Sequence, residues 1–435
     1  MILQNVLFGR VGVARSPDRF NRLAGLISTV FCLLAGIPAV LMAQNPSSKS
    51  DSLAPIHWYR GNLHTHSLWS DGNDFPEMIC KWYKDRDYHF LGLSDHNVLS
   101  SGERWMGAQT VEKRAGKNGL ARYRKVFGND WIETRVRNAN TEVRLKPFNE
   151  FRTLFDETER FLMIQAEEIT DHFGSLPVHI NATNLQDLIK PQGGKSIRET
   201  MSNNLQAIQR QQARLGRPIF AHLNHPNFGW AITAEDMAAV VEEKFFEVYN
   251  GHPSVNQLGD KDRPGLEKMW DIANTIRIEK MKLAPLYGIA TDDSHNYHGT
   301  GGASPGRGWV MVAAKRLTPA NIVNSLEAGN FYASSGVVIQ AFSFNRQEGT
   351  YSLQIQPVEG ATFRTQFIGT RKSRDSKDLK NVGIVLHESR ELNPTYKMNG
   401  DELYVRVVIH SSEPHANPSL KSQKKQAWLQ PVWQK

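Results

Sequence analysis

Histidine and acidic residues recur in short motifs along the first two thirds of the chain. His64 and His66 stand two positions apart in NLHTH, Asp71 follows in SDG, and His96 follows Asp95 in SDHN. Two histidines at positions i and i+2 of an extended backbone point to the same side, so both imidazoles can bind one metal ion. Asp71 then offers an oxygen ligand and His96 another nitrogen. These motifs predict a metal site rather than isolated surface histidines.

Four later motifs carry the same residue types. They are Glu167-Glu168, His179 in PVHI, His222 and His225 in HLNHP, and Asp292-Asp293-Ser294-His295. Mixed nitrogen and oxygen donors favour Zn, Mn or Fe over Ca or Mg, which prefer oxygen alone. Because one ion cannot use so many ligands, we expect clustered ions that share a bridging carboxylate. Such clusters are suited to the hydrolysis of phosphate esters.

The segments between these motifs indicate how they are positioned. Short apolar runs alternate with amphipathic stretches, which is typical of βα units around a parallel sheet. Since α/β active sites form at strand ends, we expect an α/β barrel or an open α/β sheet with the motifs at one end. The predicted strands are 59–63, 90–94, 161–166, 177–181, 218–223, 245–249, 284–291 and 308–313. The predicted helices include 76–84, 196–215, 233–242, 265–280 and 318–328.

Two regions depart from this pattern. Residues of about 99–159 are rich in charge, and we expect an insertion that carries helices over one face of the barrel. Whether it shapes the active site or is a solvated excursion stays open at this point. From residue 335 to 435 the segments are short and alternating, which predicts a small antiparallel β-sandwich-like domain. The main domain is therefore predicted to span residues 56–334.

The N-terminal 43 residues have the composition of an export signal. Four arginines precede an apolar run from Leu23 to Ala43, and a polar linker, residues 44–55, follows. We expect a cleaved signal peptide and export to the periplasm, the cell exterior or the outer surface. An uncleaved N-terminal membrane anchor is the alternative, because about 20 apolar residues can span a bilayer.

Charge and cysteine content limit the partners and the sources of stability. Loss of residues 1–43 removes four Arg and one Asp, which lowers the formal net charge from +8 to +5. This mild excess favours anionic substrates, but no Lys/Arg cluster with interleaved aromatics predicts a nucleic-acid groove. No obligate protein partner is evident. Cys80 would be the only cysteine left, so we expect packing and bound metal, not an internal disulfide, to stabilise the fold.

In their order, the motifs HTH, SDHN, AEEIT, PVHI, NHP and DSH resemble those of the PHP (polymerase and histidinol phosphatase) metal-dependent phosphoesterases. The resemblance covers residues of about 56–330. It implies a distorted (β/α)7 barrel, here followed by the β-rich domain, and a cluster of two to three divalent ions, Mn, Fe or Zn. The implied ligands of the three ions are, in turn, His64, His66, Glu168 and Asp293; Glu168, His179 and His225; and Asp71, His96 and His295.

Three of these positions have a close competitor in the sequence. Glu167 could take the place of Glu168, His222 that of His225, and Asp292 that of Asp293. The motifs favour the residues given, because Ile-Thr follows Glu168, Pro226 follows His225, and the family pattern is Asp-x-His. We expect the competitors to orient the ligands from behind.

The resemblance implies a hydrolase that cleaves phosphate esters of a small phosphorylated substrate by attack of a metal-bridging hydroxide. Glu168, in the bridging position, and His225, which could protonate the leaving oxygen, are the two residues assigned to catalysis. No residue is assigned to substrate binding. Two alternatives stay open: an amidohydrolase-like enzyme that cleaves other bonds, and a surface binding protein whose C-terminal domain docks to polysaccharide or membrane.

Overall fold

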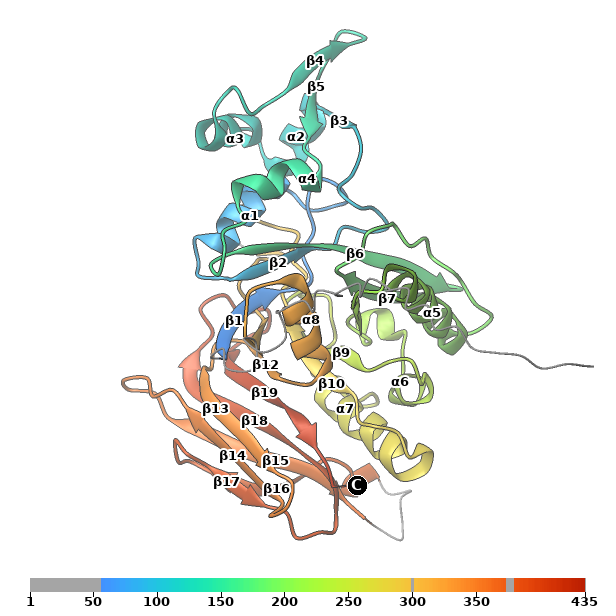
Figure 1. The fold of residues 1–435 in the computed structure, drawn as a ribbon, viewed down its shortest axis with the longest axis vertical. Helices are drawn as coiled ribbons and strands as arrows, with labels where there is room; N and C mark the ends of the chain where they lie inside the picture. Colours follow the sequence, from blue (N-terminus) through green and yellow to red (C-terminus); the bar gives the residue numbers. More distant parts are fainter. Residues whose placement is uncertain (1–55, 299–300, 373–378, 435) are drawn as a thin grey trace, which may run out of the picture. The chain divides into compact units, whose positions relative to one another are not determined.

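The computed structural model of the chain describes residues 56–298, 301–372 and 379–434 (Figure 1). The predicted signal or anchor, residues 1–43, and the linker 44–55 lie outside the described residues. Within the described part, no helix has the length and apolar character needed to cross a membrane.

The strands are β1 (His57–Asn62), β2 (Phe90–Leu93), β3 (Arg104–Gly107), β4 (Thr134–Arg137), β5 (Asn140–Leu145), β6 (Leu162–Phe173), β7 (Leu176–Thr183), β8 (Phe220–Leu223), β9 (Phe245–Asn250), β10 (Tyr287–Thr291), β11 (Trp309–Ala314), β12 (Phe331–Ser334), β13 (Ile339–Asn345), β14 (Thr350–Ile355), β15 (Phe363–Arg371), β16 (Ile384–Ser389), β17 (Thr395–Lys397), β18 (Glu402–Pro414) and β19 (Lys424–Val432). The helices are α1 (Pro76–Lys84), α2 (Ala108–Ala115), α3 (Gly119–Phe127), α4 (Phe148–Phe151), α5 (Ile197–Leu215), α6 (Ala234–Ala239), α7 (Leu266–Thr275) and α8 (Pro319–Glu327). Short helical turns are η2 (Arg152–Leu154), η3 (Phe228–Trp230), η4 (Ile276–Met281) and η5 (Leu379–Asn381).

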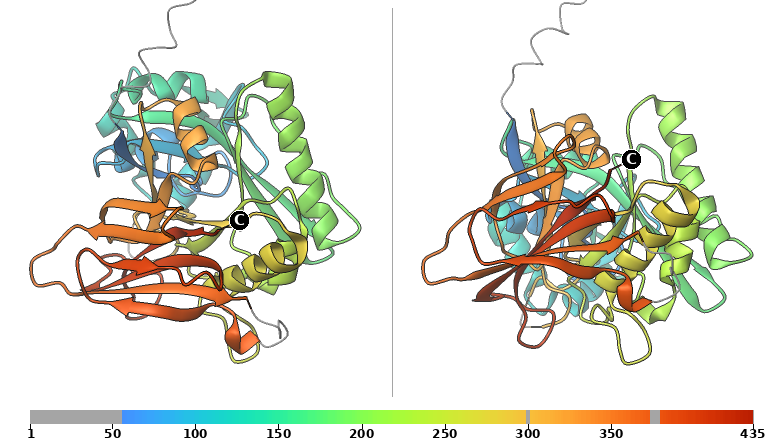
Figure 2. Two further views of the ribbon diagram at one scale, coloured as in Figure 1. Left: turned by 60° about the horizontal axis from the view of Figure 1, so that its bottom comes forward. Right: turned by 90° about the horizontal axis from the view of Figure 1, so that it is seen from below.

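The fold is mixed α/β and is organised around one large mixed sheet. Thirteen strands follow the order β10-β9-β8-β7-β6-β2-β1-β11-β12-β19-β18-β15-β16. Strands β1, β2 and β6 are parallel, as are β8, β9 and β10. Figure 2 shows α5 and α7 on the outer side of the strands. The α/β class predicted from the sequence is therefore correct.

The sheet is less parallel than predicted. Strand β6 pairs antiparallel with β7, and β7 pairs antiparallel with β8. The reason is that β6 turns into β7 through Gly174 and Ser175 alone, and Gly174 adopts a φ of 61°, which permits so tight a turn. A hairpin thus replaces the helical crossover that a parallel pair requires. This hairpin carries Glu168 on one strand and His179 on the other.

Side-chain caps fix the starts of three helices, each within one residue of the predicted start. The side chains of Ser196, Thr233 and Thr318 accept hydrogen bonds from backbone N–H groups in the first turns of α5, α6 and α8. Helix α5 ends at Gly216, whose φ of 62° is the left-handed conformation that closes a helix.

The large sheet continues from the predicted main domain into the C-terminal region. Strand β12 pairs with β19, which pairs with β18, while β13, β14 and β17 form a separate three-stranded sheet. An apolar core that includes Tyr351 and Phe367 contains residues of both sheets. Among the described residues no ladder joins β10 to β11, but the Gln430 amide exchanges two hydrogen bonds with the backbone of Gly288. Barrel closure and a complete C-terminal sandwich stay predictions.

The predicted insertion contains helices α2, α3 and α4, and also a three-stranded sheet, β3-β5-β4, that we did not predict. Its core includes Val111 and Tyr123 packed with Trp69 and Phe75. Arg114 donates hydrogen bonds to the carbonyls of Ser67, Leu68 and Gly72. The insertion therefore holds the loop that carries Asp71 and is not a free surface excursion.

A buried acid beside β9 makes stability depend on pH. Glu243 is fully buried, and its Oε1 accepts backbone N–H groups of Lys244 and Phe245, while its Oε2 has no partner within the described structure. Burial raises the pKa of Glu243 from 4.5 to about 7. The Glu243 side chain loses its proton at a lower pH in the unfolded chain than in the folded chain. The free energy of unfolding therefore falls as the pH rises from 4.5 to 7.

We expect Glu243→Gln to remove that dependence. We compare the free energy of unfolding of the variant with that of the unsubstituted chain. The difference between them should be about 3 kcal/mol larger at pH 8 than at pH 5, because the pKa of Glu243 is more than two units higher in the folded chain than in the unfolded chain. Urea unfolding of both metal-free proteins at the two pH values measures this. A difference between them that stays constant with pH would contradict the assignment.

Candidate metal centre

The structure brings all nine predicted ligands into one cluster. Each lies in a strand of the large sheet or in the loop that follows one. The ligand positions are His64, His66 and Asp71 after β1, His96 after β2, Glu168 in β6, His179 in β7, His225 after β8, and Asp293 and His295 after β10.

The innermost group consists of two imidazoles and two carboxylates. Nε2 of His64 lies 3.1 Å from both Glu168 Oε2 and Asp293 Oδ1, and Nε2 of His66 lies 3.2 Å from the same two oxygens. Ligand atoms about 2.1 Å from a tetrahedral ion lie roughly 3.4 Å apart, so these spacings fit a shared metal ion. The group matches the first ligand set.

A hydrogen bond behind His64 strengthens the case for a cation. Nδ1 of His64 lies 2.6 Å from Glu247 Oε1, which can only accept a hydrogen bond. With its Nδ1 proton donated there, the Nε2 lone pair of neutral His64 faces two carboxylate oxygens. A proton or a metal cation must therefore lie between these atoms, and the donor set suits a divalent ion.

The second group shares Glu168 through its other oxygen. Oε1 of Glu168 lies 2.9 Å from His179 Nδ1 and 3.7 Å from His225 Nε2. His225 Nε2 also lies 3.8 Å from Asp293 Oδ2. Glu168 thus presents one oxygen to each of the first two groups, which is what a carboxylate that bridges two ions requires.

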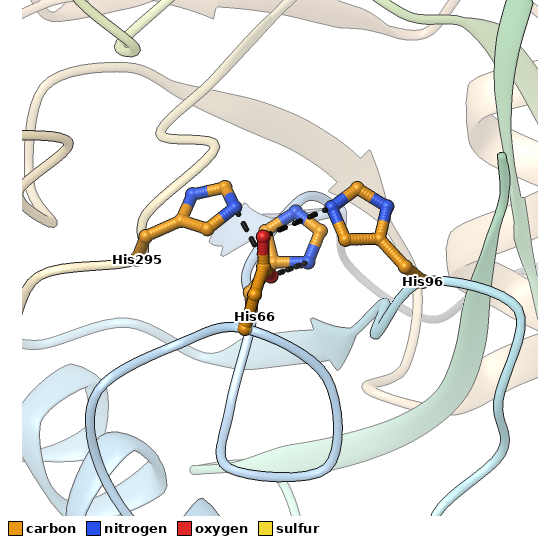
Figure 3. Close-up of side chains that lie close together, drawn as sticks. His66, His96 and His295 are labelled. Atoms are coloured by element: carbon orange, nitrogen blue, oxygen red, sulfur yellow. Dashed lines mark ion pairs between the residues drawn. The ribbon is translucent and has the colours of Figure 1, made fainter. Parts of the chain in front are cut away.

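The third group lies at the more exposed edge of the cluster. The imidazoles of His66, His96 and His295 converge there (Figure 3), and each approaches the carboxylate of Asp71. The distances from Asp71 are 3.3 Å to His295 Nε2, 3.5 Å to His96 Nε2 and 3.7 Å to His66 Nδ1. Asp71 is 56% exposed, unlike the buried Glu168, so this group is open to solvent.

Mutual electrostatics keep the acids ionised despite burial. Burial alone would raise the pKa of Glu168 and of Asp293, but the surrounding histidines outweigh it and hold both pKa values well below the usual range. Burial lowers the pKa of His96, yet Glu168 and Asp71 together raise it to about 11. In the absence of metal the cluster therefore holds protons that bound cations would displace.

Geometry separates each predicted ligand from its competitor. Alternation along β6 turns Glu167 away from Glu168, and its Oε2 accepts the backbone N–H of Ile189. Asp292 accepts hydrogen bonds from Tyr83 and from the backbone N–H groups of residues 306–308, which anchors the loop before β11. His222 lies 3.5 Å from Glu247 Oε1, behind His64. Of the three competitors, His222 contacts a group behind a predicted ligand, whereas Glu167 and Asp292 hold neighbouring segments of the chain.

Sequence reasoning missed the central role of Glu247. Besides His64, it accepts hydrogen bonds from Thr291, Asn250 and the backbone N–H of His225. Asn250 reaches on to Asp293 Oδ2 at 3.1 Å. The one available signal was the position of Glu247 on a predicted strand inside the barrel, which does not distinguish a pocket residue from a structural one.

Other supporting residues hold the remaining ligands. Asn224 donates to Glu168 Oε1 and to Asn181, which in turn donates to the carbonyl of Leu63. Asp95, the neighbour of His96, accepts from the backbone N–H and hydroxyl groups of Ser67 and Ser70 and so fixes the loop before Asp71.

We expect Glu247→Gln to weaken metal binding by roughly 10- to 100-fold, as is typical when a partner behind a ligand is lost. Four donors now share the two carboxylate oxygens of Glu247, whereas the amide of the variant offers one acceptor oxygen. His64 therefore loses its fixed orientation. Competitive titration with a chromophoric chelator measures the affinity.

The matched control is Glu242→Gln, five residues earlier. Glu242 accepts hydrogen bonds from Ser202 and Gln206 on α5 and touches no ligand. Its affinity for metal should stay unchanged, and equal losses in both variants would contradict the role given to Glu247.

Comparison with known proteins gives structural likeness only. No family model matches the chain, and no curated protein matches it. Among solved structures, a two-domain protein from Bacteroides vulgatus that contains a predicted PHP-like metal-dependent phosphoesterase is 14% identical, with a TM-score of 0.38; the match covers 86% of this chain and 95% of that one.

Two further structures match over a smaller share of the chain. A candidate metal-dependent phosphoesterase from Bifidobacterium adolescentis is 11% identical, covering 56% of this chain and 89% of that one. An amidohydrolase from Chromobacterium violaceum, with bound sulfate and no metal, is 13% identical, covering 54% and 87%. Both have a TM-score of 0.27. The structures found thus include PHP-like metal-dependent phosphoesterases, the family that the ordered motifs resemble.

Proposed function

We propose that this protein is a metal-dependent hydrolase that cleaves phosphate esters of small substrates. The observation that carries the proposal is the position of Glu168, whose two buried oxygens each face a separate set of imidazoles. A carboxylate so placed is suited to bridge two divalent ions, and clustered ions are the arrangement that phosphoester hydrolysis exploits.

The ligand sets of the proposed ions follow the three groups described above. His64, His66, Glu168 and Asp293 would hold one ion, and Glu168, His179 and His225 a second. Asp71, His96 and His295 would hold a third, with His66 Nδ1 beside them. Two to three Mn, Fe or Zn ions are consistent with this mixture of nitrogen and oxygen donors. When bound, they would acidify a water molecule and neutralise the charge on phosphoryl oxygens.

The residues of the chain supply orientation and a proton. His225 is held through its backbone by Glu247. Its Nε2 faces Glu168 and would bind the second ion, so a proton for the leaving oxygen would come from its Nδ1. Phe228 packs beside the rings of His179, His225 and His252, with the nearest centroid, that of His225, 5.1 Å away. It forms an apolar wall next to the cluster that would limit the access of water to the leaving group.

The wider setting belongs to the same proposal. We assign residues 56–334 to a barrel of the PHP type and residues 335–435 to an antiparallel β domain. We also propose export by the N-terminal segment, a small phosphorylated substrate, and neither a nucleic-acid groove nor an obligate protein partner.

Turnover before and after chelation tests the proposal. We expect the protein reconstituted with Mn, Fe or Zn to hydrolyse 4-nitrophenyl phosphate or bis(4-nitrophenyl) phosphate. Removal of metal should reduce the rate roughly a thousandfold, because metal coordination contributes several kcal/mol to the transition state. Comparing the two esters distinguishes a phosphomonoesterase from a phosphodiesterase.

A parallel panel of amides and lactones distinguishes the alternative enzyme class. Hydrolysis of these compounds alone would replace the phosphoesterase by an amidohydrolase-like enzyme. If the protein binds no metal on reconstitution and hydrolyses no compound of either panel, a binding protein is favoured instead.

Metal content of two variants tests the number of ions. We expect Asp71→Ala to lose about one equivalent, because Asp71 serves only the exposed third group. Glu168→Ala should lose two or more, because Glu168 faces two groups. Elemental analysis of the purified variants measures this, and equal losses in both would argue against a separate third ion.

A further inference from the structure

The C-terminal strands contain a hollow of about 670 Å³ that takes no part in the metal cluster. It lies where the loop 357–362, the start of β15, the loop after β16 and the adjoining ends of β18 and β19 meet. Its lining residues are Pro357, Val358, Ala361, Thr362, Phe363, Arg364, Arg390, Leu392, His410, Ser411, Ser412 and Lys424.

Charge in this hollow has one sign. Arg364, Arg390 and Lys424 line it, and no acid does, since Glu359 and Glu391 belong to the same loops but are not part of the lining. Among the described residues, Arg364 has only a long contact of 3.8 Å, to Glu388. Within the described residues, neither the Arg390 guanidinium nor the Lys424 ammonium has a hydrogen bond or ion pair. An anion could therefore bind without displacing an existing partner.

Neutral hydrogen-bond donors accompany these cations. The side chain of Gln426 lies 3.0 Å from His410 Nδ1, so its amide can donate to that nitrogen and leave the imidazole proton on Nε2. The Ser412 oxygen accepts the backbone N–H of Thr362, and its own hydroxyl proton stays available. Several donors around one hollow are suited to the oxygens of a carboxylate, sulfate or phosphate group.

Apolar side chains complete the lining. Val358 is 42% exposed and Leu392 is 39% exposed, although both are large aliphatic residues, and each lies beside the cations. Exposed apolar surface next to convergent polar groups is typical of ligand sites. The combination excludes a purely inorganic ion as the best fit, because such an ion would leave these side chains uncovered.

We propose that this hollow binds an organic anion in which a carboxylate, sulfate or phosphate group is attached to an apolar ring. The cations and the donors of His410 and Ser412 would hold the oxyanion, and Val358 and Leu392 would cover the ring. This site needs neither bound metal nor hydrolysis, so it stands or falls independently of the phosphoesterase proposal.

Isothermal titration with matched naphthalene probes tests the site on the full chain. We expect 2-naphthoate and 2-naphthalenesulfonate to bind and the neutral 2-naphthylmethanol not to bind detectably. The stronger of the two anions distinguishes a planar carboxylate from a tetrahedral oxyanion, for which the sulfonate stands in. The double variant Arg390→Gln/Lys424→Gln should weaken anion binding roughly tenfold, since two partly exposed charge pairs are lost.

The control is Lys397→Gln/Lys421→Gln, which changes the net charge equally. Both lysines are exposed in the same C-terminal region but lie outside the hollow, so anion affinity should stay unchanged. Leu392→Ala should weaken the naphthalene anions but not inorganic sulfate.

Three outcomes would overturn the proposal. These are no binding of either anion, equal binding of the neutral analogue, and equal losses in the two double variants. Binding of a short DNA duplex serves as a further comparison. If it falls equally in both double variants, the region is a diffuse basic surface and not a site.

Discussion

The structure depends on neutralising a carboxylate that has no access to solvent. Glu168 is fully buried, and an isolated ion at such a position would cost far more than the fold can supply. Four imidazoles from three other segments converge on it at 2.9 to 3.2 Å, those of His64, His66, His96 and His179. Folding of the sheet is therefore tied to the cluster, because strands that diverged would leave this charge unpaired.

A second buried acid, Glu247, orients two of the predicted metal ligands. Glu247 fixes the tautomer of His64 and, through Asn250, the orientation of Asp293. Protons and metal ions compete for the same nitrogens, since the neighbouring carboxylates raise the pKa of His64 and of His96 above their usual values. Metal affinity should accordingly rise with pH. The acids around the site both bind the metal ions and balance their positive charge.

The sequence was sufficient for the parts of the site that depend on local pattern. The ordered motifs, through their resemblance to the PHP phosphoesterases, identified the nine residues that the structure brings together. The alternation of apolar and amphipathic stretches predicted the starts of α5 and α8 to within one residue. The sequence failed where long-range contacts decide. Nothing local distinguishes Glu247 from a structural acid, and the hairpin of β6 and β7 could not be told from two parallel strands, because both are short apolar runs. The sheet of the insertion was missed because β4 is largely exposed and lacks an apolar pattern.

The C-terminal strands cannot be a passive attachment to the metal-bearing half. The segment between β18 and β19 reaches strand β9 and the residues just before β11. His415 lies 3.1 Å from the carbonyl of Arg307, and Ser419 lies 3.1 Å from the hydroxyl of Tyr249. Arg307 in turn donates to the carbonyls of Gly251 and Gly302. These contacts hold Gly302 and Arg307 in place between β10 and β11.

The same two strands line the anion hollow with His410 and Lys424, a few residues away from the bracing segment. The ends of β18 and β19 line the hollow, while the segment between these strands contacts the metal-bearing half. One region can therefore both bind an anion and stabilise the metal-bearing half.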